Sequence, residues 1–162
     1  MIANPFDRSA FGDWSLDVAV LDWMTANIPT GQRILVLGAG ATCPELEKAW
    51  DVVAIEHDLE YASKYDAVYV PLYDGWYNDT AMEETLQDHE PFDVVIIDGP
   101  PGKLSRRSKM YDFGLGWFNR PSVWLIDDVQ RRDEEWLGMR VSEYAERPMQ
   151  IIECGNKRCG VV

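Results

Sequence analysis

The chain has 162 residues, 46% of them hydrophobic, and 28 acidic against 15 basic side chains give it a net charge of −13. This length is typical of one domain, and the hydrophobic content excludes an intrinsically disordered chain. The charge argues against nucleic acid and acidic membranes as partners, and no apolar run is long enough for a membrane span. We therefore expect one cytoplasmic domain over 1–162, with an arm over 1–13, acting alone or as an oligomer on a small molecule.

The apolar pattern predicts strands that alternate with helices along the chain. Helices are expected over 15–28, with Ser15 as the N-cap, and over 43–50, 58–64, 80–89 and 133–146. Strands are expected over 33–37, 51–56, 67–72, 92–98 and 122–127, followed by a hairpin that joins 149–154 to 157–162. This alternation predicts an α/β/α sandwich whose sheet is mostly parallel, with an antiparallel strand in the C-terminal hairpin.

Polar side chains gather where four of the expected strands end. The first two junctions carry a glycine turn over 38–40 and Glu56-His57-Asp58; the later two carry Asp98 followed by Gly99-Pro100-Pro101-Gly102, and the pair Asp127-Asp128. Ligands of parallel sheets bind at the carboxyl ends of the strands. These four junctions are therefore the expected site.

The first two junctions favour a ligand that contains a nucleoside. Gly38-Ala39-Gly40 allows close approach of the backbone to a ligand, and Thr42 is expected to cap the next helix. Glu56 follows at the end of the next strand, where an acidic residue accepts hydrogen bonds from ribose hydroxyls. A tight turn and a solvated surface carboxylate are the alternatives. Cys43 replaces the third glycine of a dinucleotide fingerprint and disfavours NAD, and no phosphate-binding GxxxxGK[ST] loop occurs.

The motifs ILVLGAGAT, VAIEHD, FDVVIIDGPPG and VWLIDDVQR, followed by the terminal hairpin, resemble the class I S-adenosylmethionine-dependent methyltransferase family. The resemblance covers about residues 14–162 and implies a Rossmann-like methyltransferase fold. It implies methyl transfer to oxygen, less readily to nitrogen, of a small acceptor. By resemblance, the glycine turn meets the methionine part of the cofactor, Glu56 holds the ribose with His57 beside it, and Tyr73 and Asp74 approach the adenine.

Two positions depart from the family pattern. Val36 stands where the family usually has an acidic residue, and Thr42 takes the place of a third glycine. The loss of the acid at 36 keeps open a second interpretation, a non-catalytic nucleoside-binding or assembly module with the same fold. An NAD-dependent enzyme is a third interpretation, which Cys43 disfavours.

Three carboxylates at the later junctions suggest a divalent cation. Asp98, Asp127 and Asp128 are similar in position to the ligands of metal-dependent O-methyltransferases, which implies Mg²⁺ bound to the acceptor oxygens. The alternative is ordinary ion pairing, with Asp128 capping the next helix and bound to Arg131 or Arg132. Asp98 is expected to be a catalytic residue in either case.

A basic stretch follows Asp98 directly. Residues 103–109 carry four positive charges and no acid, and should overhang the site. Arg106 is expected to bind an anionic or polyhydroxylated acceptor, because guanidinium groups suit carboxylate and phosphate. Lys103 is the alternative general base if burial lowers its pKa. A solvated loop that neutralises the aspartates is the alternative interpretation of this stretch.

Overall fold

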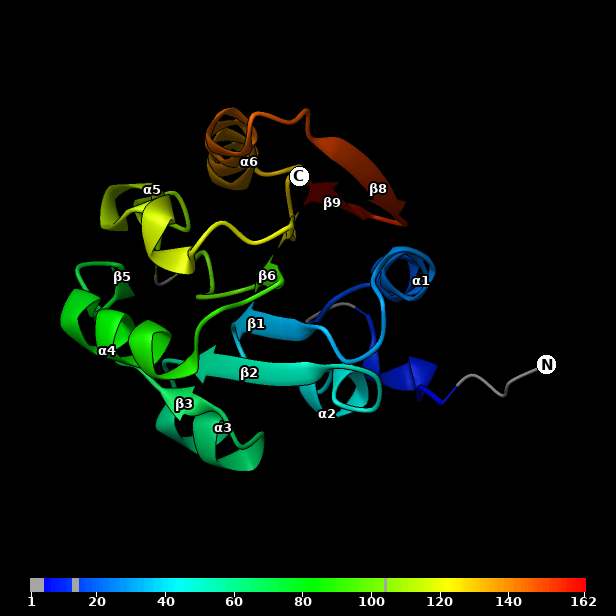
Figure 1. The fold of residues 1–162 in the computed structure, drawn as a ribbon, viewed down its shortest axis with the longest axis horizontal. Coiled ribbons are helices and arrows are strands. Elements are labelled where there is room, and N and C mark those ends of the chain that lie inside the picture. The colour runs from blue at the N-terminus through cyan, green and yellow to red at the C-terminus, as the bar shows by residue number, and fades with distance from the viewer. Residues whose placement is uncertain (1–4, 13–14, 104) are drawn as a thin grey trace.

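The computed structural model describes residues 5–12, 15–103 and 105–162. They form a seven-stranded sheet with the order β3-β2-β1-β6-β7-β9-β8 and a separate two-stranded ribbon (Figure 1). The sheet strands are β1 (Arg33–Leu37), β2 (Asp51–Glu56), β3 (Val68–Tyr69), β6 (Val94–Ile97), β7 (Val123–Ile126), β8 (Gln150–Cys154) and β9 (Lys157–Val161). The ribbon consists of β4 (Leu72–Tyr73) and β5 (Trp76–Tyr77).

Helices connect the parallel strands. The α-helices are α1 (Val18–Asn27), α2 (Cys43–Leu46), α3 (Leu59–Lys64), α4 (Asp79–His89), α5 (Lys109–Phe113) and α6 (Arg132–Ala145). The described residues also form two short 3-10 helices, η1 (Arg8–Ala10) and η2 (Leu115–Phe118). In the described part of the chain, no helix is both long and apolar enough to cross a membrane.

The strand directions confirm the expected fold class. Strands β3, β2, β1, β6 and β7 run parallel to their neighbours. The C-terminal hairpin closes one end of the sheet, where β9 pairs antiparallel with β7 and β8 lies outside it. The chain therefore has a mostly parallel sheet with an antiparallel hairpin strand, as the alternation of elements predicts.

Alternate residues of each central strand pack into two separate cores. In β1, Leu35 and Leu37 join the core formed with α4, α5 and α6, whereas Ile34 and Val36 join the core formed with α1 and α2. Side chains of a strand point alternately to its two faces, so a wholly apolar strand must be covered on both. Figure 1 shows α4 and α5 on one side of the central strands and α1 and α2 on the other.

The described part of the arm packs on the second of these faces. Phe6 stacks on Trp50 with ring centroids 5.8 Å apart. Arg8 donates two hydrogen bonds to the carboxylate of Asp22 on α1, at 2.6 and 2.8 Å. Residues 1–4 of the expected arm, and its last residue 13, lie outside the described residues.

The N-cap of helix α1 lies two residues later than the sequence predicts. Its N-cap is Asp17, whose carboxylate accepts a hydrogen bond from the backbone N–H of Ala19 at 2.8 Å. The Ser15 hydroxyl instead donates to the carbonyl of Ala10 at 3.0 Å. Both residue types are good N-caps, and the backbone contact of Ser15 with the preceding arm decides between them.

The strand expected over 67–72 is also divided. Only Val68–Tyr69 pairs with β2, and β4 and β5 then form a hairpin across Asp74 and Gly75. These two residues have φ values of 49° and 78°. A two-residue turn with both φ values positive is the type I′ turn that favours Asp-Gly in hairpins. The chain therefore leaves the main sheet after Tyr69.

Candidate functional site

The glycine turn after β1 touches the chain that leaves β6. A Cβ on Gly38, whose φ is +97°, would lie 2.7 Å from the backbone nitrogen of Gly99. A Cβ on Gly99 would lie 2.6 Å from the Cα of Gly38. Any other residue at either position would force the two backbones apart. Gly40 differs, because a Cβ there would meet no atom within 4 Å.

A cavity of about 330 Å³ opens at these carboxyl ends of the strands. Its size falls within the range of small-molecule sites, about 300–1,000 Å³. Six of its lining residues are ones that the sequence marks as site residues: Gly38, Ala39, Gly40, Glu56, His57 and Asp98. Three more lining residues, Asp58, Gly99 and Pro101, belong to the expected junctions, although the sequence interpretation assigned them no role of their own. The sequence interpretation did not place Ser15 and Tyr61 at the site.

Glu56 organises the cavity wall. One carboxylate oxygen, Oε2, accepts from the N–H of Ala39 at 3.0 Å. The other, Oε1, accepts from the N–H groups of His57 and Asp58 at 2.7 and 2.8 Å. Glu56 thus holds the glycine turn, while Val36, which is 1% exposed, packs in the α1–α2 core. The loop therefore has its acidic anchor at the end of β2 and none at position 36.

The helix after the glycine turn is a single turn, and its expected cap is absent. The Thr42 side chain makes no capping hydrogen bond, and the backbone of Thr42 is already helical. The carbonyls of Gly40 and Thr42 accept from Cys43 and Leu46 instead. Thr42 therefore holds the expected N-cap position, but the side-chain cap predicted for it does not form.

Tyr73 and Asp74 do not line the cavity, in contrast to the sequence expectation. Tyr73 is 74% exposed. The Asp74 carboxylate lies 2.6 Å from the Nζ of Lys109 on α5. Tyr73 and Asp74, on the β4–β5 hairpin, therefore lie outside the lining that contains Glu56.

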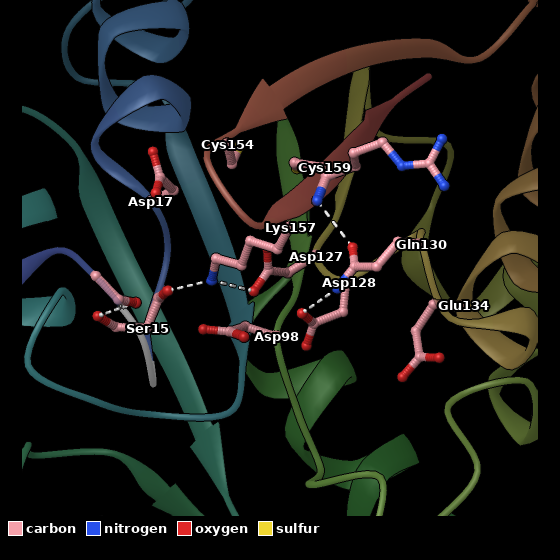
Figure 2. Close-up of polar contacts among 12 residues, drawn as sticks. Ser15, Asp17, Asp98, Asp127, Asp128, Gln130, Glu134, Cys154, Lys157 and Cys159 are labelled. Atoms are coloured by element: carbon pink, nitrogen blue, oxygen red, sulfur yellow. Dashed lines mark hydrogen bonds and ion pairs between the residues drawn. The ribbon is translucent and has the colours of Figure 1, made fainter.

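Asp98 and Asp127 lie side by side because they follow the paired residues Ile97 and Ile126 of adjacent strands. Asp127 is 1% exposed, and its Oδ2 accepts a hydrogen bond from the Nζ of Lys157 at 2.8 Å (Figure 2). The Asp98 side chain is 15% exposed and borders the cavity. One of the two carboxyls therefore faces the ligand space and the other faces a lysine.

Asp128 has its own partners. Its carboxylate lies 3.0 Å from the Nη1 of Arg131 and accepts a hydrogen bond from the Gln130 amide at 3.0 Å. Its ion pair with Arg131 is the one anticipated from the sequence. Asp128 does not cap α6, whose N-cap is Arg131 itself.

The basic stretch before α5 divides into exposed and buried charges. Lys103 and Arg106 are exposed and do not line the cavity. Arg107, 3% exposed, points inward and donates to the carbonyl oxygens of Pro100, Asp127 and Asp98 at 3.2, 3.2 and 2.6 Å. Arg107, not its neighbour Arg106, is therefore the arginine that contacts the aspartate loops.

Arg107 also neutralises the surrounding carboxylates. Its guanidinium nitrogens lie 3.8–3.9 Å from carboxylate oxygens of Asp98, Asp128 and Glu134. Glu134, on α6, is 3% exposed, and its burial raises its pKa although Arg107 opposes the shift. No local sequence pattern distinguishes Arg107 from Arg106 or marks Lys157 and Glu134 as members of the site.

The carboxylates do not suit a divalent cation. Asp127 is bound by Lys157 and Asp128 by Arg131, so fixed cations already occupy positions beside their oxygens. Within residues 5–12, 15–103 and 105–162, no group of three His, Cys, Asp or Glu side chains is arranged to hold a metal ion. The Mg²⁺ site anticipated at Asp98, Asp127 and Asp128 is therefore not supported.

The surroundings of Asp98 shift the pKa of its carboxyl strongly. Burial raises its pKa well above the usual range for aspartate, and the neighbouring Asp127 raises it further. Arg107 and Lys157 oppose this shift. An aspartate of this kind, bordering a cavity, is a candidate for proton transfer.

Comparison with solved structures identifies the fold. The precorrin 8W decarboxylase of Methanobacterium thermoautotrophicum is 14% identical, with a TM-score of 0.56 over 90% of this chain and 80% of that chain. The magnesium protoporphyrin IX methyltransferase ChlM of Synechocystis PCC 6803, with bound SAM, is 12% identical, with a TM-score of 0.51 over 95% and 86%.

MycE, a methyltransferase of the mycinamycin biosynthetic pathway in complex with Mg and SAH, is 15% identical, with a TM-score of 0.56. The likeness covers 94% of this chain but 51% of MycE, so the chain spans about half of MycE's length. No protein-family model and no curated protein sequence matches. The chain has the class I methyltransferase fold, as its motifs indicate.

Proposed function

We propose that this protein is an S-adenosylmethionine-dependent methyltransferase that acts on oxygen, less readily on nitrogen, of a small acceptor. The observation that carries the proposal is the cavity itself, which brings the glycine turn, Glu56 and Asp98 to one sheet edge. A binding cradle and a carboxyl suited to proton transfer thus border the same space. The fold alone does not define the reaction, so the proposal depends on these residues.

The residues present fit S-adenosylmethionine. Open space at Gly40 lets the cofactor approach the backbone, and Oε2 of Glu56 accepts one protein hydrogen bond, which leaves it able to accept another from a ribose hydroxyl. When bound, S-adenosylmethionine supplies a methyl group on a positively charged sulfur. The acidic lining contributed by Glu56 and Asp58 favours a cationic ligand of this kind.

Asp98 is the proposed proton acceptor. A hydroxyl becomes a better nucleophile as it loses its proton, and a carboxylate whose pKa is raised is a stronger base than an ordinary aspartate. Arg107 donates to the Asp98 carbonyl and holds the loop that carries it. We therefore assign the carboxyl to proton transfer and the arginine to its positioning.

The proposed acceptor is small and polyhydroxylated or anionic. Lys103 and Arg106 follow the cavity-lining Pro101 by two and five positions and remain exposed. In the described chain neither lies within 4.0 Å of an acidic side chain, so both are free to bind an acidic group of the acceptor. Lys103 is proposed for this binding rather than for proton transfer, since nothing buries it.

A non-catalytic nucleoside-binding module is the second candidate. It is favoured by the structural role of Glu56, whose carboxylate accepts hydrogen bonds from the backbone N–H groups of Ala39, His57 and Asp58. Calorimetric titration with S-adenosylmethionine, S-adenosylhomocysteine and NAD separates the candidates. Binding of both sulfur ligands without transfer to any polyhydroxylated acceptor supports the module, and absence of heat with a folded protein refutes both.

Gly40→Ala is expected to weaken S-adenosylmethionine binding at least about tenfold, which is about 1.4 kcal/mol. Gly40 lines the cavity, and the added methyl meets no protein atom within 4 Å, so the free energy of unfolding should change by less than about 0.5 kcal/mol. Calorimetry and urea denaturation measure the two effects. Gly116→Ala, also in open space but outside the cavity, is the matched control, and equal affinities of both variants would contradict the proposed pose.

Glu56→Ala is expected to weaken the same binding by about 1.5–3 kcal/mol, the value of a hydrogen bond to a charged group. The protein should also lose stability, because the N–H groups of Ala39, His57 and Asp58 lose their acceptor. Glu60→Gln, on the neighbouring helix and outside the cavity, is the control. Unchanged affinity in Glu56→Ala would restrict Glu56 to its structural role.

A further inference from the structure

Lys157 is a buried cation at the point where three parts of the chain meet. It is the first residue of β9 and is 8% exposed. Its Nζ donates to Oδ2 of Asp127 at the end of β7 and to the carbonyl oxygen of Ser15, before α1 (Figure 2). Since Ser15 and Asp98 both line the cavity, the ammonium group lies directly behind its wall.

The ammonium group balances a carboxylate that would otherwise be buried without a partner. Among the described residues, Lys157 is the only cation within 4.0 Å of the Asp127 carboxylate. Burial lowers the pKa of Lys157, but its hydrogen bond to Asp127 and the charges of Asp127, Asp98 and Asp128 outweigh burial and raise it overall. Lys157 is therefore a permanent charge at this position.

The contact also determines how Asp127 meets Asp98. Lys157 occupies Oδ2 of Asp127, and the buried Oδ1 has no hydrogen-bond partner in the described structure. The pairing of Ile97 with Ile126 brings the Asp98 carboxyl next to this side chain. Oδ1 is thus left to accept a proton shared with Asp98, and a metal ion would have to displace Lys157 to reach both oxygens.

We propose that Lys157 is the built-in cation of the Asp98–Asp127 pair, that it replaces a divalent metal there, and that it positions Asp98 toward the cavity. The ammonium supplies the counter-charge that lets two neighbouring carboxyls be buried together. The same ammonium group also binds the carbonyl oxygen of Ser15, which lines the cavity, and so connects that part of the lining to the sheet. The positioning part rests on the proposed methyl transfer, whereas the replacement of a metal does not.

The test is the response of stability to magnesium. Wild type should show the same melting temperature in excess EDTA and in millimolar MgCl₂. Lys157→Met removes the charge at similar volume, so it should melt at lower temperature in EDTA and regain stability with MgCl₂, by the linkage of binding to folding. Lys109→Met, which breaks the exposed pair with Asp74, is the matched control and should not respond to MgCl₂.

A second variant keeps the proposal falsifiable if Lys157→Met does not fold. The double substitution Lys157→Met/Asp127→Asn removes both charges, so it should be more stable than Lys157→Met alone. Its melting temperature should not change with MgCl₂. A wild type that gains stability from MgCl₂ overturns the proposal. A double variant as unstable as Lys157→Met also overturns it, because packing rather than charge would then be the role of Lys157.

Methyl transfer tests the positioning part separately. Wild-type transfer should persist in EDTA, whereas transfer by Lys157→Met should become dependent on MgCl₂. Wild-type transfer abolished by EDTA refutes the metal-free site. If wild type transfers no methyl group under any condition, the proposed function fails, yet the melting experiments still decide whether Lys157 takes the place of a metal.

Discussion

Arg107→Met is expected to remove about 3–5 kcal/mol from the free energy of unfolding at neutral pH. Loss of one partner from a buried ionic network leaves uncompensated charges and carries a cost of this size. Here three carbonyl oxygens lose their donor, and the carboxylates of Asp98, Asp128 and Glu134 lose a shared cation. Urea denaturation monitored by tryptophan fluorescence measures the loss.

The adjacent arginine provides the control. Arg106 is exposed, so Arg106→Met should change the same free energy by no more than about 0.5 kcal/mol. The loss in Arg107→Met should shrink as the pH falls, because protonated carboxyls no longer need a counter-charge. Equal stabilities of the two methionine variants would show that the inward contacts of Arg107 contribute little.

Local patterns were sufficient for most of the fold. A strand buried on both faces must be apolar throughout, and 34–37 and 94–97 have this pattern because the sheet is covered on both sides. The prediction was wrong at the start of α1 and in the strand expected over 67–72, where local contacts compete. Two good caps stand close together at Ser15 and Asp17, and the Asp-Gly turn at 74–75 forms a hairpin of its own outside the main sheet. The dipeptide Asp74-Gly75 is itself a sequence pattern that predicts a hairpin.

The sequence predicted which residues line the cavity only where they follow the ends of neighbouring parallel strands. The glycine turn, Glu56 and Asp98 end neighbouring parallel strands, so the rule for ligand position brought them to one cavity. Lys157 lies 30 residues from Asp127 and reaches it because β9 inserts beside β7. Sequence alone gives no register for that insertion, and no means of telling which of two adjacent arginines turns inward.

Asp98→Asn is expected to stabilise the protein at neutral pH while it abolishes most methyl transfer. Burial first, and then the charge of Asp127, raises the native pKa of Asp98 well above the unfolded value of about 3.9. Between these two pKa values the unfolded chain binds fewer protons than the native one, so wild-type stability falls as the pH rises. Asparagine does not ionise, and it keeps an N–H group that can donate to Asp127.

The stability gain of Asp98→Asn should therefore depend on pH. Denaturation curves should nearly coincide at pH 3 and then separate by about 1.4 kcal/mol for each unit between the two pKa values. Asp127→Asn is the contrasting variant, since it leaves Lys157 buried without its carboxylate and should lose stability. Parallel pH profiles for wild type and Asp98→Asn would show that the native Asp98 has an ordinary pKa.

Transfer should change in the opposite direction to stability. Proton transfer by a positioned side chain contributes about a hundred- to ten-thousandfold to rate, so Asp98→Asn should lose turnover on that scale and keep its affinity for S-adenosylmethionine. Wild-type turnover should rise with pH through the pKa of Asp98, over the range in which its stability falls. Burial of the Asp98 carboxyl thus destabilises the fold and at the same time makes the carboxylate a stronger base. Full turnover in Asp98→Asn would show that Asp98 is not the base.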